Sequence, residues 1–530
     1  MHADVPSSTE ILVIGGGPAG AYAACTLARE GFRVVLLEKD HFPRYHIGES
    51  MLASIKGFLR FIGAEEKVAN HGFTVKVGGA VKLNQHKREG YTDFISPDPT
   101  KAAWNVVRSE FDEILLRHAA ECGVCVCEGV QVNGIEFSSG VDERPVSAEW
   151  KSDLGVTQKL DFKWLIDASG RAGIMSTKYL KNRKFNQALK NIAFWGYWTG
   201  AGSYGIGTSR ENAPWFEALK GMWHETGWAW FIPLHNGTVS VGVVLNEEAS
   251  RKKKAALEGP EQNKIHYLTQ LRLAPGVMDL LGGAILTTEI KSAGDYSYSA
   301  TYHAGPNFRI VGDAGGRVGF SNGEQIDPFF SSGVHLAFAG GLSAAASIAA
   351  SIRGHCTEAD AIQFHNDKVG TSYTRFLIAV LSIYRQINAQ AAPVLSDIDE
   401  DNFDRAFDFL RPVIQGSADI DKTVTEDILQ RTMDFCEHAM APTTSEMHAG
   451  VAARMGPSLV AADGPVMGVE QVAALAGKDE EAKQVLWAVN ARKAVGGLVD
   501  WERTFESGNL RGLSIVLERA KLGLRRIEVN

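Results

Sequence analysis

The sequence predicts an α/β protein that opens with a Rossmann-like nucleotide-binding fold and continues into a largely antiparallel second sheet. A glycine-rich turn between two short apolar strands predicts the first part, and later apolar stretches with strand-like alternation predict the second. The last third alternates charged and apolar stretches and is predicted to be mostly helical. We place a core at 1–390, with the second sheet at about 190–301, and a C-terminal helical region at 391–530.

The stretch Ile11–Asp40 is predicted to form a strand, a turn, an Ala-rich helix and a second strand. Its glycines Gly15, Gly17 and Gly20 form the pattern G-x-G-x-x-G. In this pattern the first glycine permits a tight turn, the second lets the backbone approach a pyrophosphate, and the third lets the helix pack closely. Glu38 follows the second strand, where a carboxylate can bind ribose hydroxyls. The stretch therefore predicts a dinucleotide site.

Composition argues against several other classes of protein. The net charge of −8 gives no sign of nucleic-acid binding. Cys122, Cys125 and Cys127 have no matching Cys/His pair nearby, so no metal site is predicted. No secretory signal opens the chain, and we expect a reduced, cytoplasmic protein. The stretch Pro328–Ile352 lacks charged residues, but its Ala, Gly and Ser content favours a closely packed helix over a membrane span.

Three polar motifs follow the first strands. Residues 41–54, HFPRYHIGESMLAS, place a cation, hydroxyls and an acid just before a helix. His71–Leu83 is predicted to be a strand with Lys76 inside it, and a lysine in such a strand is usually exposed. Asn105–Arg117 is predicted to pass from a strand into an amphipathic helix that begins near Arg108.

Further motifs lie in the second half of the core. A strand at about 159–165 leads to Asp167-Ala168-Ser169-Gly170, where small residues allow close backbone approach. In WAWFIP, residues 228–233, Trp228 and Trp230 point to the same side of a strand that Pro233 ends. A later strand ends in Gly312-Asp313.

Together these motifs resemble those of the flavin-dependent halogenases, in particular the fungal branch that acts on phenolic, polyketide-type metabolites. G-x-G-x-x-G, R-Y-H-I-G-E-S, W-x-W-x-I-P and D-P-x-x-S-S-G occur in the family's order, and the resemblance covers about residues 8–415. It implies the FAD-binding fold of the flavin monooxygenase superfamily. Residues 397–412, DIDEDNFDRAFDFLRP, resemble a segment of the fungal phenol halogenases, a region that helps to shape the substrate pocket.

The resemblance also implies roles for individual residues. The catalytic lysine of the family aligns with Lys76 on the pattern G-F-x-x-K-x-G-x-A, with Lys82 the weaker candidate. The two tryptophans, Trp228 and Trp230, would keep the organic substrate away from the flavin. The backbone N–H groups of Ser332 and Gly333 would hold the halide at the start of a helix. The cofactor-binding residues would be Gly15, Gly17, Gly20, Glu38, Arg44, Ser50, Arg108, Gly312 and Asp313.

The implied reaction uses FADH2 from a separate flavin reductase, because we recognise no second nucleotide fold in the sequence. Oxygen and chloride or bromide would then give hypohalous acid, which reaches Lys76. The lysine would either hydrogen-bond the acid or become a chloramine, and the halogen would replace a ring hydrogen of a phenol. A protonated lysine can only donate, whereas the chloramine route needs a neutral amine. The sequence leaves both routes open.

Two departures from the family pattern keep alternatives open. Residues 316–325, GRVGFSNGEQ, form an insertion of about eight residues relative to the relatives, and Phe330 stands where tryptophan halogenases carry a glutamate. The lack of that glutamate favours the phenol- and pyrrole-acting branch. The insertion allows a flavin-binding homologue that has lost turnover, and an ordinary flavin-dependent aromatic hydroxylase is the other alternative. Asp463 is a candidate base for phenol deprotonation.

Overall fold

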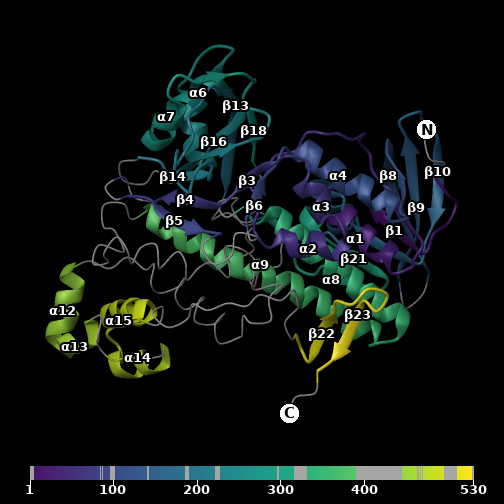
Figure 1. Ribbon diagram of the computed structural model, residues 1–530. Helices are drawn as coiled ribbons and strands as arrows, with labels where there is room; N and C mark the ends of the chain where they lie inside the picture. Colours follow the sequence, from purple (N-terminus) through teal and green to yellow (C-terminus); the bar gives the residue numbers. More distant parts are fainter. Residues whose placement is uncertain are drawn as a thin grey trace.

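The computed structural model describes residues 5–83, 85, 88–95, 102–139, 143–185, 190–220, 227–294, 298–315, 331–388, 445–461, 465, 467, 469–493 and 510–527. Within these residues two large sheets dominate the fold, and the long helix α9 (Glu358–Asn388) runs below both in the view of Figure 1. The predicted α/β fold class is confirmed.

The first sheet has six strands in the order β20-β21-β11-β1-β2-β7. Five are parallel, and β20 pairs antiparallel with β21 at one edge. Every residue of the central strands β1 and β11 is buried, as expected of a parallel sheet that is covered on both faces. The strand bounds are β1 Ile11–Ile14, β2 Val34–Leu37, β7 Cys125–Cys127, β11 Trp164–Asp167, β20 Ala304–Gly305 and β21 Phe308–Ile310.

Helices cover one face of this sheet and a smaller antiparallel sheet covers the other. The helices are α1 (Pro18–Arg29), α2 (Ile55–Ile62), α3 (Glu65–Ala69), α4 (Arg108–Glu121) and α8 (Gly333–Arg353). The smaller sheet has the order β10-β9-β8, with β8 Val130–Phe137, β9 Pro145–Ser152 and β10 Thr157–Asp161. The strand predicted at 159–165 is therefore two strands, β10 and β11, in two different sheets.

Helix α8 corresponds to the apolar stretch noted in the sequence. It is long and apolar enough to cross a membrane by length and composition, but 89% of its most apolar window is buried inside the structure. Its small residues allow close packing on α1, because a Cβ atom at Gly341 would come within 2.9 Å of the carbonyl oxygen of Ala19. Within the described residues it is a core helix, as predicted.

The second large sheet has eight strands, ordered β17-β13-β16-β15-β14-β4-β5, with β18 also paired to β13. Neighbouring strands are antiparallel except β4 and β14, which agrees with the predicted antiparallel sheet. Helices α5, α6 and α7 accompany it, and α6 and α7 pack on one face (Figure 1). The bounds are β4 Gly78–Lys82, β5 Gly90–Asp93, β13 Asn191–Thr199, β14 Trp215–Ala218, β15 Gly227–Pro233, β16 Thr238–Asn246, β17 Ile285–Leu286, β18 Lys291–Ala293, α5 Glu247–Ala255, α6 Gln262–Leu271 and α7 Pro275–Leu281.

A short strand pair connects the two large sheets. β3 (Thr74–Lys76) pairs antiparallel with β6 (Ala103–Asn105), and β3 is followed after one residue by β4 of the eight-stranded sheet. The strand predicted over His71–Leu83 is therefore broken at Val77, with its two halves in different sheets. Lys76 lies at this break.

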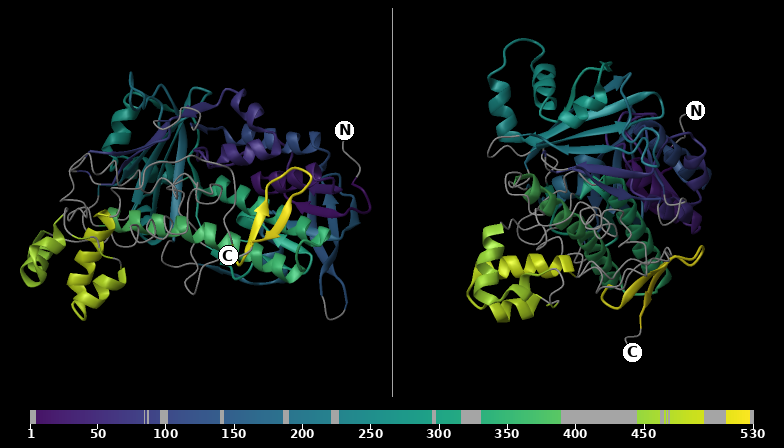
Figure 2. Two further views of the ribbon diagram at one scale, coloured as in Figure 1. Left: turned by 60° about the horizontal axis from the view of Figure 1, so that its bottom comes forward. Right: turned by 60° about the vertical axis from the view of Figure 1, so that its left-hand side comes forward.

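The C-terminal part differs from the single helical region predicted for 391–530. Helices α12 (Ser445–Met455), α13 (Pro457–Val460), α14 (Val469–Ala476) and α15 (Glu480–Lys493) share a small core of their own. The chain then returns as a hairpin, β22 (Leu513–Val516) and β23 (Gly523–Arg526), which lies beside α8 (Figure 2). Leucine and isoleucine side chains of this hairpin belong to the same core as α1 and α8.

Candidate functional site

The glycine turn lies at the centre of the parallel sheet, at the carboxyl end of β1, where such sheets bind ligands. Gly15 has a φ of +103°, and a Cβ atom there would overlap the carbonyl oxygen of Ala168. A Cβ atom at Gly20 would overlap the carbonyl oxygen of Gly15, so the third glycine lets α1 pack on the turn itself. Gly17 precedes the first residue of α1, and the N-terminus of that helix opens toward the turn.

Glu38 closes this turn from the end of β2. It is 5% exposed, and its two carboxylate oxygens accept hydrogen bonds from the backbone N–H groups of Gly16 (2.5 Å) and Asp40 (2.9 Å). Each oxygen retains a lone pair for a further donor. The residue predicted to bind ribose is therefore held rigidly beside the glycines.

Two of the predicted cofactor residues, Arg44 and Arg108, converge on a carboxylate that the sequence reasoning missed. Asp112 is fully buried, accepts two hydrogen bonds from Arg108 (2.8 and 2.9 Å) and one from Arg44 (3.1 Å). Arg108 and Asp112 are four residues apart on α4, and this i,i+4 spacing could have predicted their ion pair from the sequence. Arg44 also approaches the turn, since a Cβ atom at Gly17 would lie 3.3 Å from its guanidinium nitrogen.

Gly312 and Asp313, which are also predicted to bind the cofactor, follow a strand of the same parallel sheet. Gly312 has a φ of +58° and lies two residues after β21, and Asp313 is close enough to His46 of the 41–54 loop to affect its charge. Burial, together with the nearby Arg108 charge, lowers the pKa of His46, while Asp112 and Asp313 oppose that shift. Arg108, Asp112 and Asp313 are thus close enough to His46 to influence its charge, although these residues come from three distant parts of the sequence.

Lys76 is buried, 3% exposed, whereas its neighbour Val75 is 51% exposed. A lysine in such a strand is usually exposed, but here the lysine is buried and the neighbouring valine is exposed. Its Nζ donates a hydrogen bond of 2.9 Å to the carbonyl oxygen of Met51 and lies 5.1 Å from the centre of the Phe94 ring. Burial lowers the pKa of Lys76 to about 7, because the charged form loses its hydration.

A hydrogen-bonded row of aromatic side chains ends on Glu49 of the same loop. Trp195 Nε1 donates to the hydroxyl of Tyr45 (2.7 Å), which lies 3.0 Å from the hydroxyl of Tyr197. Tyr197 in turn donates to Glu49 Oε1 at 2.5 Å. Burial raises the pKa of Glu49 to about 7, although hydrogen bonds from Tyr197 and Ser240 and the charge of Arg108 oppose the shift.

Trp228 and Trp230 lie on β15 as predicted, with their ring centres 5.8 Å apart. Trp230 Nε1 donates to the hydroxyl of Ser240 at 3.1 Å. The Trp230 ring fills the space over Gly242, where any Cβ atom would overlap it. The two tryptophans are 1% and 6% exposed and form a fixed, buried aromatic wall.

The predicted halide residues are at the start of α8. Ser332 precedes the helix and is 2% exposed, whereas Gly333 is exposed and a Cβ atom there would meet no atom within 4 Å. The helix start is tied to the 41–54 loop, because Ser54 Oγ lies 2.9 Å from His335 Nδ1. Residues 51–54 therefore connect the Lys76 contact at Met51 with the first turn of α8.

Several predicted features lie outside the described residues: the insertion 316–325, Phe330, the segment 397–412 and Asp463. Ser50 is described and buried at 5%, next to Glu49. Of the other predicted cofactor residues, Gly15, Glu38 and Gly312 lie just past the carboxyl ends of β1, β2 and β21.

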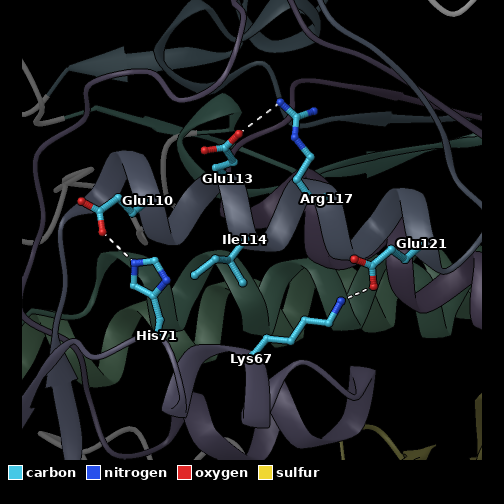
Figure 3. A pocket seen from close by; sticks show the side chains of 7 residues that line it. All are labelled: Lys67, His71, Glu110, Glu113, Ile114, Arg117 and Glu121. Carbon is cyan, nitrogen blue, oxygen red and sulfur yellow. Dashed lines mark hydrogen bonds and ion pairs between the residues drawn. The ribbon is translucent and has the colours of Figure 1, made fainter.

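A surface pocket of about 300 Å³ lies elsewhere, on the outer side of α4 (Figure 3). Its charges are paired with one another: His71 with Glu110 (2.7 Å), Arg117 with Glu113 (3.3 Å), and Lys67 with Glu121. Asp112, on the buried side of the same helix, is not part of it. This pocket is separate from the flavin residues.

The structure also gathers residues that the sequence did not connect. The donor atoms of Cys25, His118 and Cys122 lie within 4.8 Å of one another, as do those of His71, Glu110 and His235. In the first group His118 Nε2 already lies 2.9 Å from the carbonyl oxygen of Ile62.

The residues present fit a bound FAD. The turn around Gly15 leaves no room for side chains, the start of α1 favours phosphate charge, and Glu38 can accept from a ribose hydroxyl. Arg44 and Arg108 add positive charge held in place by Asp112. These features suit a long anionic dinucleotide.

Comparisons with known proteins agree with this geometry. Residues 8–314 match the family model of the FAD binding domain. The flavin-dependent halogenases armH1 and armH3 of Armillaria mellea are 57% and 55% identical to this chain; each match covers 99% of it, and 100% and 99% of the relative. The solved structure of the myxobacterial chondrochloren halogenase CndH is similar with a TM-score of 0.62 and 27% identity, covering 82% of this chain and 97% of that one. The resemblance recognised from sequence motifs ended at about residue 415, whereas the two fungal matches also cover the C-terminal residues.

Proposed function

The chain belongs to the flavin-dependent halogenases, FADH2-dependent oxidoreductases, and we propose that it halogenates electron-rich phenolic rings with Lys76 as its catalytic residue. The observation that carries the proposal is the burial of Lys76 with a pKa of about 7. A surface lysine would be protonated and hydrated, and would have no means of handling a reactive halogen species selectively.

FAD would be held by the residues of the carboxyl edge: Gly15, Gly17, Gly20, Glu38, Arg44, Arg108, Gly312 and Asp313. Bound as FADH2, it supplies with oxygen the oxidising power that converts a halide into hypohalous acid. Chloride or bromide would bind at the backbone N–H groups of Ser332 and Gly333, where the N-terminus of α8 favours negative charge.

Lys76 would act on the hypohalous acid that reaches it. As an ammonium it donates a hydrogen bond to the oxygen of the acid and makes the halogen more electrophilic. As a neutral amine it attacks the halogen, and hydroxide leaves and takes up the proton to form water. At a pKa of about 7 both forms are present near neutral pH, so the structure is compatible with either route.

The aromatic wall of Trp228 and Trp230 would keep the organic substrate away from the flavin. A substrate ring kept away from the flavin can be halogenated by hypohalous acid that diffuses to it. Direct hydroxylation needs the ring against the flavin, so the arrangement favours halogenation. The rigid packing of Trp230 over Gly242, and its hydrogen bond to Ser240, hold the wall in place.

A phenol is the substrate class that suits this chemistry, because its oxygen donates electron density to the ring carbons that an electrophilic halogen attacks. The resemblance of residues 397–412 to fungal phenol halogenases, and Phe330 in place of glutamate, favour a freestanding polyketide-type phenol. We further infer that a separate flavin reductase supplies FADH2 and that the protein acts in the cytoplasm.

The experiment supplies purified protein with FAD, a flavin reductase, NADH and chloride or bromide, and offers resorcylic and hydroxyquinoline phenols. Mass spectrometry is expected to show the isotope pattern of one added halogen. A hydroxylated product would contradict the proposal and favour a flavin-dependent hydroxylase. Failure to bind FAD would instead point to the catalytically impaired homologue that the insertion 316–325 suggests.

A further inference from the structure

Three short stretches of the chain lie side by side around Lys76. β6 pairs with β3, so that Asn105 is opposite Thr74 and Ala103 is opposite Lys76. On its other side β6 meets the 41–54 loop, where Ser50 is bridged to Asn105 and the backbone N–H of Met51 donates to the carbonyl of Trp104 at 3.0 Å.

This pairing fixes which side chains share a face. Directly opposed residues of antiparallel strands project to the same side, and so do alternate residues of one strand. Ser50, Asn105 and Lys76 therefore project from the same face of this small sheet.

The polar atoms on this face are buried without partners. Asn105 is fully buried, and neither its amide nitrogen nor its amide oxygen has a hydrogen-bond partner in the described part of the chain. The same holds for the hydroxyl of Ser50, which is 5% exposed. The family resemblance assigns Ser50 to the cofactor, whereas its pairing with Asn105 places it on the face that carries Lys76. Buried polar groups in folded proteins are nearly always hydrogen-bonded, because leaving them unpaired is costly. An amide and a hydroxyl in this state, on the same face of the sheet as a buried lysine, point to a small polar ligand.

We propose that Asn105, with Ser50 beside it, binds the hypohalous acid that Lys76 uses, and so orients the halogen toward the lysine. This rests on the proposed function. The amide N–H donates to the oxygen of the acid, and the amide oxygen accepts its O–H, which leaves the halogen end toward Lys76. A neutral ligand is favoured here, because an amide offers one donor group and one acceptor and no charge.

The same binding mode would also assist the transfer of the halogen from the acid. The bond between oxygen and halogen breaks while a bond from halogen to the neutral amine of Lys76 forms, so this orientation selects the chloramine route. The departing hydroxide takes the proton that the amine releases, and water results. The Asn105 amide can donate to this oxygen throughout, so it stabilises the negative charge that develops on it.

The test compares the wild-type protein with Asn105→Leu and Asn105→Asp under saturating FAD. Two quantities are measured per NADH consumed: halogenated phenol, and free hypohalous acid trapped by a 1,3-diketone scavenger. For Asn105→Leu we expect about tenfold less halogenated phenol, and a matching rise in trapped acid. For Asn105→Asp, whose carboxylate would favour the ammonium form, we expect the pH profile of the lysine-dependent step to move to higher pH. A wild-type ratio of product to trapped acid in Asn105→Leu, with an unmoved profile in Asn105→Asp, would overturn the proposal.

A second readout does not depend on activity. Asn490 is also buried, but its amide is paired inside the chain, donating to the Leu486 carbonyl (2.7 Å) and accepting from the Met467 N–H (2.8 Å). Asn490→Leu should lower the unfolding temperature, whereas Asn105→Leu should leave it unchanged or raise it, because no internal hydrogen bond is lost. An equal fall in both variants would assign Asn105 a structural role and reject the proposal. Wild-type protein that forms no halogenated phenol would reject the phenol substrate, and the ratio of trapped acid between wild type and Asn105→Leu would still test the site.

Discussion

Lys76 donates its hydrogen bond to the backbone carbonyl of Met51, at 2.9 Å, rather than to a carboxylate. The lowered pKa of the lysine has one cause, burial, and among the residues that the structure describes no negative charge offsets it. The contact also joins the lysine to the 41–54 loop, in which Arg44 approaches the glycine turn and Ser54 contacts His335 in the first turn of α8. One short loop thus connects the residues proposed to hold FAD with the lysine proposed to transfer the halogen.

The burial of Lys76 predicts a pH-dependent cost in stability. Its pKa falls from 10.5 in the unfolded chain to about 7 in the folded protein, so between these values only the unfolded chain holds the proton. The cost is complete below pH 7 and disappears as the pH rises to 10.5. Lys76→Met should therefore stabilise the protein most at pH 6 and progressively less toward pH 10, as measured by urea unfolding. A difference that does not change with pH would contradict the lowered pKa.

Glu49 should show the opposite dependence. Burial raises its pKa from 4.5 to about 7, so the folded protein gains stability from protonation, fully present below pH 4.5 and lost as the pH rises through 7. Wild-type protein should lose stability relative to Glu49→Gln between pH 5 and pH 8. Tyr197→Phe removes a hydrogen bond that favours the carboxylate, and should move this loss to higher pH. Parallel stability curves for wild type and Glu49→Gln would show that Glu49 does not titrate in this range.

Asp112 should be essential for positioning Arg44 and Arg108, the two arginines proposed to bind FAD. Asp112→Asn removes a buried charge that pairs with Arg108 and Arg44, and breaking such a pair costs about 3–5 kcal/mol. FAD affinity, followed by flavin fluorescence, should fall together with stability. Glu113→Gln is the matched control one residue along, because it breaks only an exposed ion pair with Arg117, worth roughly 0–1 kcal/mol. Equal effects of the two changes would reject the role given to Asp112.

Replacing Gly20, the third glycine of the turn, tests whether close packing or helix propensity has the larger effect on stability. Gly20→Ala should gain roughly 1 kcal/mol of helix propensity in α1, but its Cβ atom would overlap the carbonyl of Gly15. The overlap is with backbone and cannot be relieved cheaply, so we expect net destabilisation and loss of FAD binding. Gly283→Ala, where a Cβ atom meets nothing within 4 Å, should change neither. FAD titration of both variants checks this, and tight binding by Gly20→Ala would contradict the close contact.

The nucleotide-binding fold could be predicted because its signals are local. The strand, turn and helix of residues 11–37 each follow from neighbouring residues, and so does the pairing of Trp228 with Trp230 on one strand. The break at Val77 could not be predicted, because the strand is divided between two sheets that form only in the folded chain.

The polar residues of the site were harder to predict from sequence alone. The sequence shows that Lys76 and its neighbours alternate between the two faces of a strand. It does not show which face is buried, because that depends on β6 and the 41–54 loop, which are distant in sequence. Asp112 and Asn105 lie within ordinary helix and strand patterns and carry no motif of their own. The return of β22 and β23 to the core of α1 and α8 depends on contacts across nearly the whole chain, such as Leu522 N–H to Glu30 at 3.0 Å.

The most direct test of the central claim compares Lys76→Met with Lys82→Met in the reductase-coupled assay. Both variants lose one lysine, but Lys82 lies on β4, outside the face that carries Asn105. We predict that Lys76→Met still binds FAD and consumes NADH while halogenated phenol falls by about a hundredfold or more and trapped hypohalous acid rises. Lys82→Met should keep near-wild-type halogenation. Halogenation that persists in Lys76→Met, or is lost equally in Lys82→Met, would contradict the account.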